Sequence, residues 1–213
     1  MRKTACFILC ILLCVLQAVC MAEENDDDLV WRWLIPHEAV VEQNCPPVDD
    51  AWLTDDEDML LAMKALRDWY HKESWGGEVY SDSRYVLLVN PFIFQTDQSE
   101  NHKTIYCTAH FENFLLYSSS GKKTLFLVDY LFQAFTVELE KSEGEWVALS
   151  VEIPELGEEL VPGWGMGTQG VNGVTDEMIE MMDEGDHYDR MEGYIRKYLD
   201  HTHLEDAEID RGP

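Results

Sequence analysis

The sequence predicts an α+β domain, in which an N-terminal helix packs on a bent antiparallel sheet of about four strands, with a C-terminal helix. Three observations predict this class. Apolar residues recur at three- and four-residue spacing in 54–70, β-forming residues joined by short links fill most of 84–153, and a second helical stripe follows in 175–201. The first and third patterns are typical of helices that bury one face, and short links between strands favour antiparallel pairing.

The chain begins with the pattern of an export signal. Arg2 and Lys3 precede an apolar run over 5–16, and Cys20-Met21-Ala22 places small residues at the positions that signal peptidase reads. We expect 1–22 to be a signal peptide cleaved after Ala22, which makes the protein secreted or extracytoplasmic. An uncleaved anchor helix and a lipoprotein modified at Cys20 are the alternatives. All three place the following domain outside, because the basic residues stay inside.

Residues 23–50 read as an acidic extended arm. The arm starts with the acidic run EENDDD, continues with an apolar cluster that includes Trp31 and Trp33, and ends near Cys45-Pro46-Pro47. We expect the arm to pack its tryptophans on the domain. Trp31 and Trp33 are also candidates for contact with a ligand or partner.

The domain proper is expected over 51–160 and opens with a helix. Thr54-Asp55-Asp56-Glu57 has the form of a capping box, in which the threonine hydroxyl and the glutamate carboxylate bind free amides at a helix start. One apolar stripe follows over 59–70, and Ser74-Trp75-Gly76-Gly77 ends the helix.

Four strands are expected next. Pro91 within 84–94 indicates a sheet edge or a bulge, because proline donates no ladder hydrogen bond. The segment 103–117 alternates clearly, and 124–140 is long enough to require a bend. A hairpin at Glu143-Gly144 leads into 145–153. Alternation in this last strand predicts four residues turned inward: Val147, Leu149, Val151 and Ile153.

Residues 161–213 are expected to form a glycine-rich loop, a C-terminal helix and a frayed polar tail from Leu204. The run from Gly165 to Gly170 matches the dinucleotide-binding pattern, but no strand leads into it and acidic residues open the following helix. We therefore expect a loop and no cofactor. Trp164 in this loop is a candidate for ligand or partner contact. The helix should bury Tyr188, Met191, Ile195 and Tyr198.

The charge balance limits the partners. The chain has 15 basic and 42 acidic residues, and Arg2 and Lys3 are the only charged residues in 1–22, so the mature chain keeps 13 basic residues and a net charge of −29. Such a field repels nucleic acid and anionic lipid and attracts cations or basic proteins. We expect a small molecule or a basic protein as partner, no nucleic acid, and membrane contact only through an uncleaved or lipidated N-terminus.

Two of the six cysteines, Cys45 and Cys107, lie outside the export segment. In an oxidising compartment they are candidates for one disulfide that ties the arm to the domain. The alternative is that Cys107 is a small buried apolar residue on a strand.

The order of elements over 51–153 resembles the nuclear-transport-factor-like, or ketosteroid-isomerase-like, fold. Gly144-Glu145-Trp146 is similar to a Gly-x-Trp hairpin of exported members, whereas the closing helix departs from the family pattern. The resemblance implies a pocket between the helix and the bent sheet. It also implies a pocket carboxylate with tyrosine or histidine partners.

Asp129 is the candidate for such a carboxylate. Leu127 and Leu131 flank it at strand spacing and suggest apolar surroundings, which would raise its pKa and suit a general base. Its candidate catalytic partners are Tyr106, His110 and Tyr130. The alternative is a bulge or change of face that leaves Asp129 solvated.

Two groups of residues are candidates for metal ligands. Asp183, Glu184, Asp186 and Asp189 could collect a hard cation, but their spacing is not that of a calcium-binding loop. His187, His201 and His203 lack the remaining ligands of a transition-metal site. No metal site is therefore assigned.

Three functions follow from these features. The first is an exported, acidic, non-catalytic binding or interaction module with a small-molecule pocket. The second is an acid–base enzyme, an isomerase or dehydratase, centred on Asp129. The third is a surface protein that binds divalent cations.

Overall fold

The computed structural model describes residues 34–73, 83–167 and 171–212. The expected signal peptide and both arm tryptophans, Trp31 and Trp33, lie outside the described residues. By its contacts the chain divides into two compact units, 1–39 and 40–213. Of the first unit, 34–39 contains a turn in which the Ala39 N–H donates to the Pro36 carbonyl at 2.9 Å. All that follows concerns the second unit.

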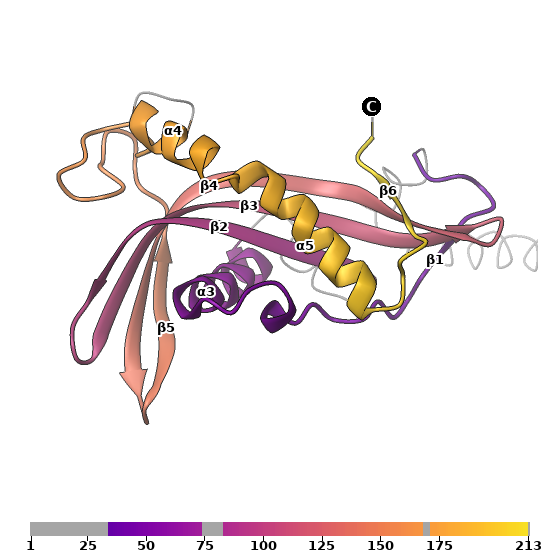
Figure 1. Ribbon diagram of the computed structural model, residues 1–213, viewed down its shortest axis with the longest axis horizontal. Helices are drawn as coiled ribbons and strands as arrows, with labels where there is room; N and C mark the ends of the chain where they lie inside the picture. Colours follow the sequence, from indigo (N-terminus) through magenta and orange to yellow (C-terminus); the bar gives the residue numbers. More distant parts are fainter. Residues whose placement is uncertain (1–33, 74–82, 168–170, 213) are drawn as a thin grey trace, which may run out of the picture. The chain divides into compact units, whose positions relative to one another are not determined.

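The α+β class is confirmed: one long helix and two shorter helices pack on a mixed, mostly antiparallel sheet (Figure 1). The helical elements are η1 (Asp50–Trp52), α3 (Glu57–Glu73), α4 (Asp176–Glu184) and α5 (His187–His201). The strands are β1 (Val40–Val41), β2 (Tyr85–Gln98), β3 (His102–Ser119), β4 (Lys122–Ser142), β5 (Glu145–Glu152) and β6 (Glu208–Asp210).

The long strands β3 and β4 form the centre of the sheet. β2 and the short β1 pair with β3, while β5 and β6 pair with β4, and only the β4–β6 pairing is parallel. Among the described strands β2 pairs only with β3, so Pro91 lies in an edge strand, which is one of the two alternatives predicted for it. The β4–β5 hairpin turns at Glu143 and Gly144, whose φ angles of 54° and 94° match the predicted two-residue link.

Three bulges interrupt the pairing and account for the bent sheet. The register skips Phe94 in β2, Val128 in β4 and Leu149 in β5. A bulge bends its strand and increases the local twist. In Figure 1 the far ends of β2–β5 turn down beside α3, so the sheet curves around that helix.

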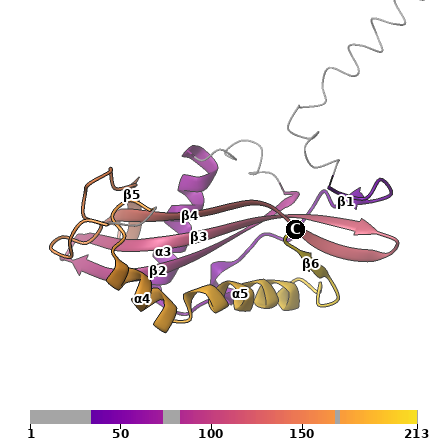
Figure 2. The same cartoon turned by 90° about the horizontal axis from the view of Figure 1, so that it is seen from above.

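Helices cover both faces of the sheet (Figure 2). α3 packs on the face that carries Cys107, Ala109 and Phe111, which we call the α3 face. α4 and α5 cover the opposite face, the α5 face, where Phe114 and Leu116 meet α5. The first seven residues of β2 are all buried, because both faces of this strand are covered. The predicted stripe of the last helix is confirmed at Met191, Ile195 and Tyr198; the Tyr188 side chain lies outside the described part.

Three local predictions need correction. The cap of α3 is Asp56, whose Oδ1 accepts the Met59 N–H at 2.9 Å, and Thr54 binds the Asp56 N–H instead. The C-terminal helix is two helices, because Asp186 takes a φ of 49° between α4 and α5. The tail is not frayed: Leu204 is buried, and β6 pairs with β4.

Candidate functional site

Asp129 lies next to the bulge in β4, and the bulge decides its face. Leu127 pairs with Phe114, whereas Asp129 pairs with Asn113, so the unpaired Val128 turns Asp129 to the face opposite Leu127. The expectation that Asp129 and Leu127 share a face is therefore wrong. On the α3 face the Asp129 carboxylate accepts a hydrogen bond from the hydroxyl of Tyr70 in α3, and its other oxygen accepts the Tyr130 N–H at 2.9 Å.

The expected partners of Asp129 lie on the other side of the sheet. Tyr106 and His110 alternate with Cys107 on β3 and so point to the α5 face. Tyr130 contacts His110 there, with ring centroids 5.6 Å apart. Burial and the neighbouring Asp97 raise the pKa of Tyr106. The structure thus brings His110 and Tyr130 together but separates them from Asp129.

His110 has a neighbour that sequence reasoning did not pair with it, His187 at the start of α5. Their ring centroids are 4.7 Å apart, and Phe132 and Phe92 pack on the two imidazoles. The Asn90 carboxamide donates to the His187 carbonyl at 2.7 Å. Burial lowers the pKa of His110 to about 4 and that of His187 to about 3. Both rings are therefore neutral at neutral pH.

The remaining metal candidates are dispersed. His201 stacks on Trp52 with ring centroids 4.9 Å apart, and His203 is exposed near Glu205. Asp183, Glu184, Asp186 and Asp189 are all exposed around the α4–α5 junction. Within the described ranges, no three His, Cys, Asp or Glu side chains are grouped so that they could hold a metal ion.

The expected disulfide is not formed: within the described residues no bond joins Cys45 and Cys107. The two cysteines belong to different core clusters, Cys45 with α5 and Cys107 with α3, because Cys107 points to the α3 face. The Cys45 thiol donates to the Arg84 carbonyl at 3.2 Å. Burial raises the pKa of Cys107 to about 12, so this thiol is an unreactive part of the core.

Trp164 belongs to a small core cluster under α4. Its ring lies 6.4 Å from that of Phe94, and the cluster is built around Met178 and Met182. Gly167 in the same loop packs so closely that a Cβ would lie 2.4 Å from the Val174 carbonyl oxygen. This glycine therefore serves close packing.

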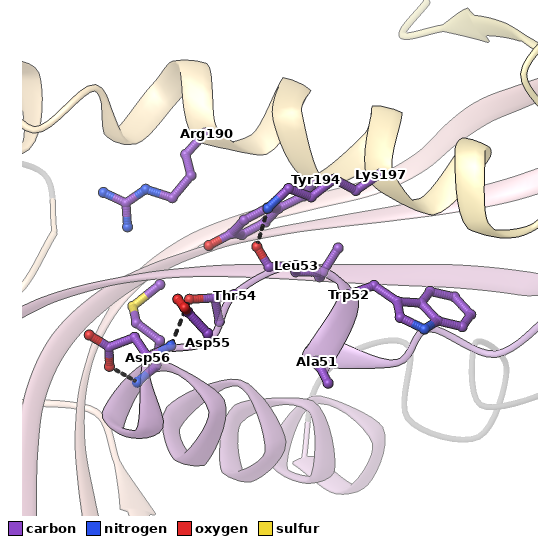
Figure 3. Close-up of a pocket in the computed structure, with 10 residues that line it drawn as sticks. Ala51, Trp52, Leu53, Thr54, Asp55, Asp56, Arg190, Tyr194 and Lys197 are labelled. Atoms are coloured by element: carbon purple, nitrogen blue, oxygen red, sulfur yellow. Dashed lines mark hydrogen bonds between the residues drawn. The ribbon is translucent and has the colours of Figure 1, made fainter.

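A cleft with a volume of about 660 Å³ lies between the start of α3 and one side of α5, and Figure 3 shows the residues that line it. Its polar residues include Arg190, Tyr194 and Lys197 of α5. Lys197 Nζ donates to the Leu53 carbonyl at 2.5 Å, and Arg190 donates to the carbonyls of Gly185 and Pro91 at 3.1 and 3.4 Å. Tyr194 is buried, which raises its pKa. The cations of this cleft already bind backbone carbonyls, so they connect α5 to the segments around Leu53 and Pro91.

A second cleft, which we call the α3–β5 groove, has a volume of about 930 Å³. Its α3 wall consists of Leu61, Lys64, Ala65, Asp68, Trp69, Lys72 and Glu73, and its other wall of β5, Ile153 and Leu139. Trp69 is held by an edge contact with Phe135, with ring centroids 4.8 Å apart. On the other wall Lys103 and Lys141 lie over the Trp146 ring, 5.2 and 5.7 Å from its centroid.

The groove keeps apolar side chains in solvent. Val147, Leu149 and Ile153 are 51%, 56% and 41% exposed, so the prediction that they turn inward is wrong for these three. The bulge at Leu149 shifts the alternation, and Trp146 and Val151 pack on the core instead. The sequence signal was present as apolar alternation in 145–153, but alternation does not show whether a face is covered.

The edge of β5 that faces away from β4 is also open. Within the described strands β5 pairs only with β4, and no other backbone hydrogen bond reaches it from the described segments. An open edge presents N–H and C=O groups that can pair with another chain.

Comparison with known proteins adds no relative. No protein-family profile, no curated protein and no solved structure matches this chain. None of the helices in the described segments is both long and apolar enough to span a bilayer.

Proposed function

We propose that this protein is an exported, non-catalytic binding module whose binding surface is the α3–β5 groove. One observation carries the proposal: three apolar side chains that strand alternation would normally bury stand in solvent along one wall of a cleft. Contiguous exposed apolar surface typically marks an interaction or ligand site. The opposite wall includes Trp69, whose ring is held by its edge contact with Phe135.

The acid–base alternative has less support. Asp129 lines neither cleft, and its carboxylate is engaged by Tyr70 and by the Tyr130 amide. His110 and Tyr106, its expected partners, lie on the other face of the sheet. A general base must reach the proton that it removes, and neither of these clefts gives substrate a path to Asp129.

A neutral, polarity-sensitive dye such as Nile red tests the proposal. We expect the dye to bind the native protein with a blue-shifted emission, and Leu149→Glu to weaken this binding about ten-fold by placing a charge in the groove. Leu156→Glu is the matched control, because Leu156 is 91% exposed and lies outside the groove. Equal loss in both variants, or in neither, would contradict the proposal.

A further inference from the structure

We infer that the α3–β5 groove binds an extended segment of a basic partner protein, which adds to the sheet as a strand beside β5. This inference rests on the proposed function, since it names the occupant of the same groove. Three independent features carry it: the open edge of β5, the different character of its two faces, and the charge around it.

The open edge gives an extended chain its main-chain partners. β5 pairs with β4 on one side, and within the described strands none lies on the other. A segment that adds here would satisfy backbone groups that otherwise face water, as in other cases of strand addition. Edge strands of this kind need protection or a partner.

The two faces beside β5 differ, and this difference sets the chemistry of the occupant. Trp146 and Val151 pair with Lys141 and Val137 and lie on the α3 face, where the groove is. Val147, Ser150 and Glu152 pair with Glu140, Glu138 and Thr136 and so lie on the outer face, although Val147 also borders the groove. Because side chains of a strand alternate, an added segment would turn every second side chain to the α3 face of the sheet, with Trp146 and Val151, and the others to the outer face, where Glu138, Glu140 and Glu152 lie.

The local charge selects a basic occupant. Residues 136–159 hold eight glutamates and one lysine. Glu138, Glu140, Glu145 and Glu152 are all exposed at the hairpin. Complementary charge steers association and suppresses partners of the same sign.

The same charges disfavour a second copy of this chain. In antiparallel self-pairing of β5 about its centre, Glu145 of one copy would lie opposite Glu152 of the other. Like charges directly opposite destabilise a strand pair. The bulge at Leu149 further interrupts a regular self-paired ladder.

The test uses the full chain and a labelled heptapeptide of alternating lysine and valine. We expect saturable binding by fluorescence anisotropy, weaker at high ionic strength, with slowed amide hydrogen exchange in 145–152. The matching peptide of alternating glutamate and valine should bind at least ten-fold more weakly. Two further lysine peptides carry methyl groups on alternate backbone nitrogens, each on one of the two possible sets. The peptide whose methylated nitrogens would face β5 should not bind, whereas the peptide whose methylated nitrogens face away should still bind.

Two variants test whether the carboxylates of Glu152 and Glu138 attract the lysine peptide. Glu152→Gln and Glu138→Gln should each weaken the lysine peptide about three-fold, as expected for exposed ion pairs. Glu205→Gln is the matched control, since this exposed glutamate follows α5 at the far end of the chain, and it should leave binding unchanged.

The outcomes distinguish failure of the inference, that a basic segment adds to β5, from failure of the proposed function, that the groove is a binding surface. Equal binding of the glutamate peptide, or of both methylated registers, overturns the inference. Without peptide, only the amides of 145–152 that bond to β4 should be protected. Protection of the outward-facing amides in the free protein also overturns the inference, because the edge is then already paired with another part of the chain or, if protection depends on concentration, with a second copy. If Nile red binds in the groove but the lysine peptide does not, the inference fails and the proposed function stands. If neither binds, both fail.

Discussion

At the scale of single residues, the bulge at Val128 decides which side chains Asp129 contacts. A regular strand would place Asp129 beside Leu127, but the bulge at Val128 turns it to the α3 face, where Tyr70 donates to it. Tyr70 is 1% exposed and stacks on Phe111 with ring centroids 5.4 Å apart. The carboxylate therefore joins the end of α3 to the centre of the sheet.

This role predicts the effect of removing the hydroxyl. Tyr70→Phe should lower the free energy of unfolding by about 1–2 kcal/mol, because a partly buried carboxylate loses a donor. Urea denaturation monitored by tryptophan fluorescence measures the change. Asp129→Asn keeps an acceptor oxygen and should lose less than Asp129→Ala. A Tyr70→Phe variant as stable as wild type would contradict this assignment.

At the scale of elements, the junction of α4 and α5 depends on two neutral imidazoles. His110 of β3 and His187 of α5 lie against each other beneath this junction. Arg190 of α5 contributes to lowering the pKa of His187, and Tyr130 of β4 contacts the ring of His110. Protonation of either ring would place a charge in a largely buried site, which burial disfavours.

Acid should therefore destabilise the protein before its carboxylates titrate. Burial lowers the pKa of His110 to about 4 and of His187 to about 3, from 6.5, so the unfolded chain binds more protons than the folded chain between these values. The free energy of unfolding should be constant above about pH 6.5 and fall on acidification by about 1 kcal/mol per pH unit for each histidine.

Chemical denaturation between about pH 7.5 and 5 measures this slope, above the range in which ordinary carboxylates titrate. His71, whose pKa burial also lowers, contributes with the same sign. His187→Phe should remove one histidine's share of the slope and leave the rest. An unchanged slope in this variant would refute the role of the pair.

At the scale of the whole molecule, the sheet separates two cores. One joins α5 to Cys45 and Phe114, and the other joins α3 to Cys107 and Phe111. Each cysteine is buried in its own core, so neither thiol reaches solvent unless the domain opens.

Maleimide labelling followed by peptide mass spectrometry tests this arrangement. Without reductant, Cys45 and Cys107 should stay unlabelled in the native protein and should both react once urea unfolds it, because no disulfide holds them and burial suppresses the Cys107 thiolate. Labelling that requires prior reduction would show that the two thiols are bonded.

Much of the architecture could be predicted because its signals are local. The spacing of Met59, Met63 and Leu66 defines a helix face, and the Glu143-Gly144 pair defines a hairpin. The site could not be predicted in this way. Whether Leu149 is buried, and which face Asp129 takes, depends on bulges that shift the alternation by one residue and leave no mark in the pattern itself.

The sequence by itself therefore determined the α+β class, the order of the main elements and the strongly acidic charge, and it narrowed the place of Pro91 to a sheet edge or a bulge. These follow from periodicity, turn chemistry and composition, each of which acts over a few residues or over the whole chain at once. Only the tertiary structure decided that Cys45 and Cys107 lie in separate cores, that His110 meets His187, and that the apolar side chains of β5 stay in solvent. Those outcomes depend on which surfaces of distant segments meet, and burial is a property of such contacts rather than of any one segment.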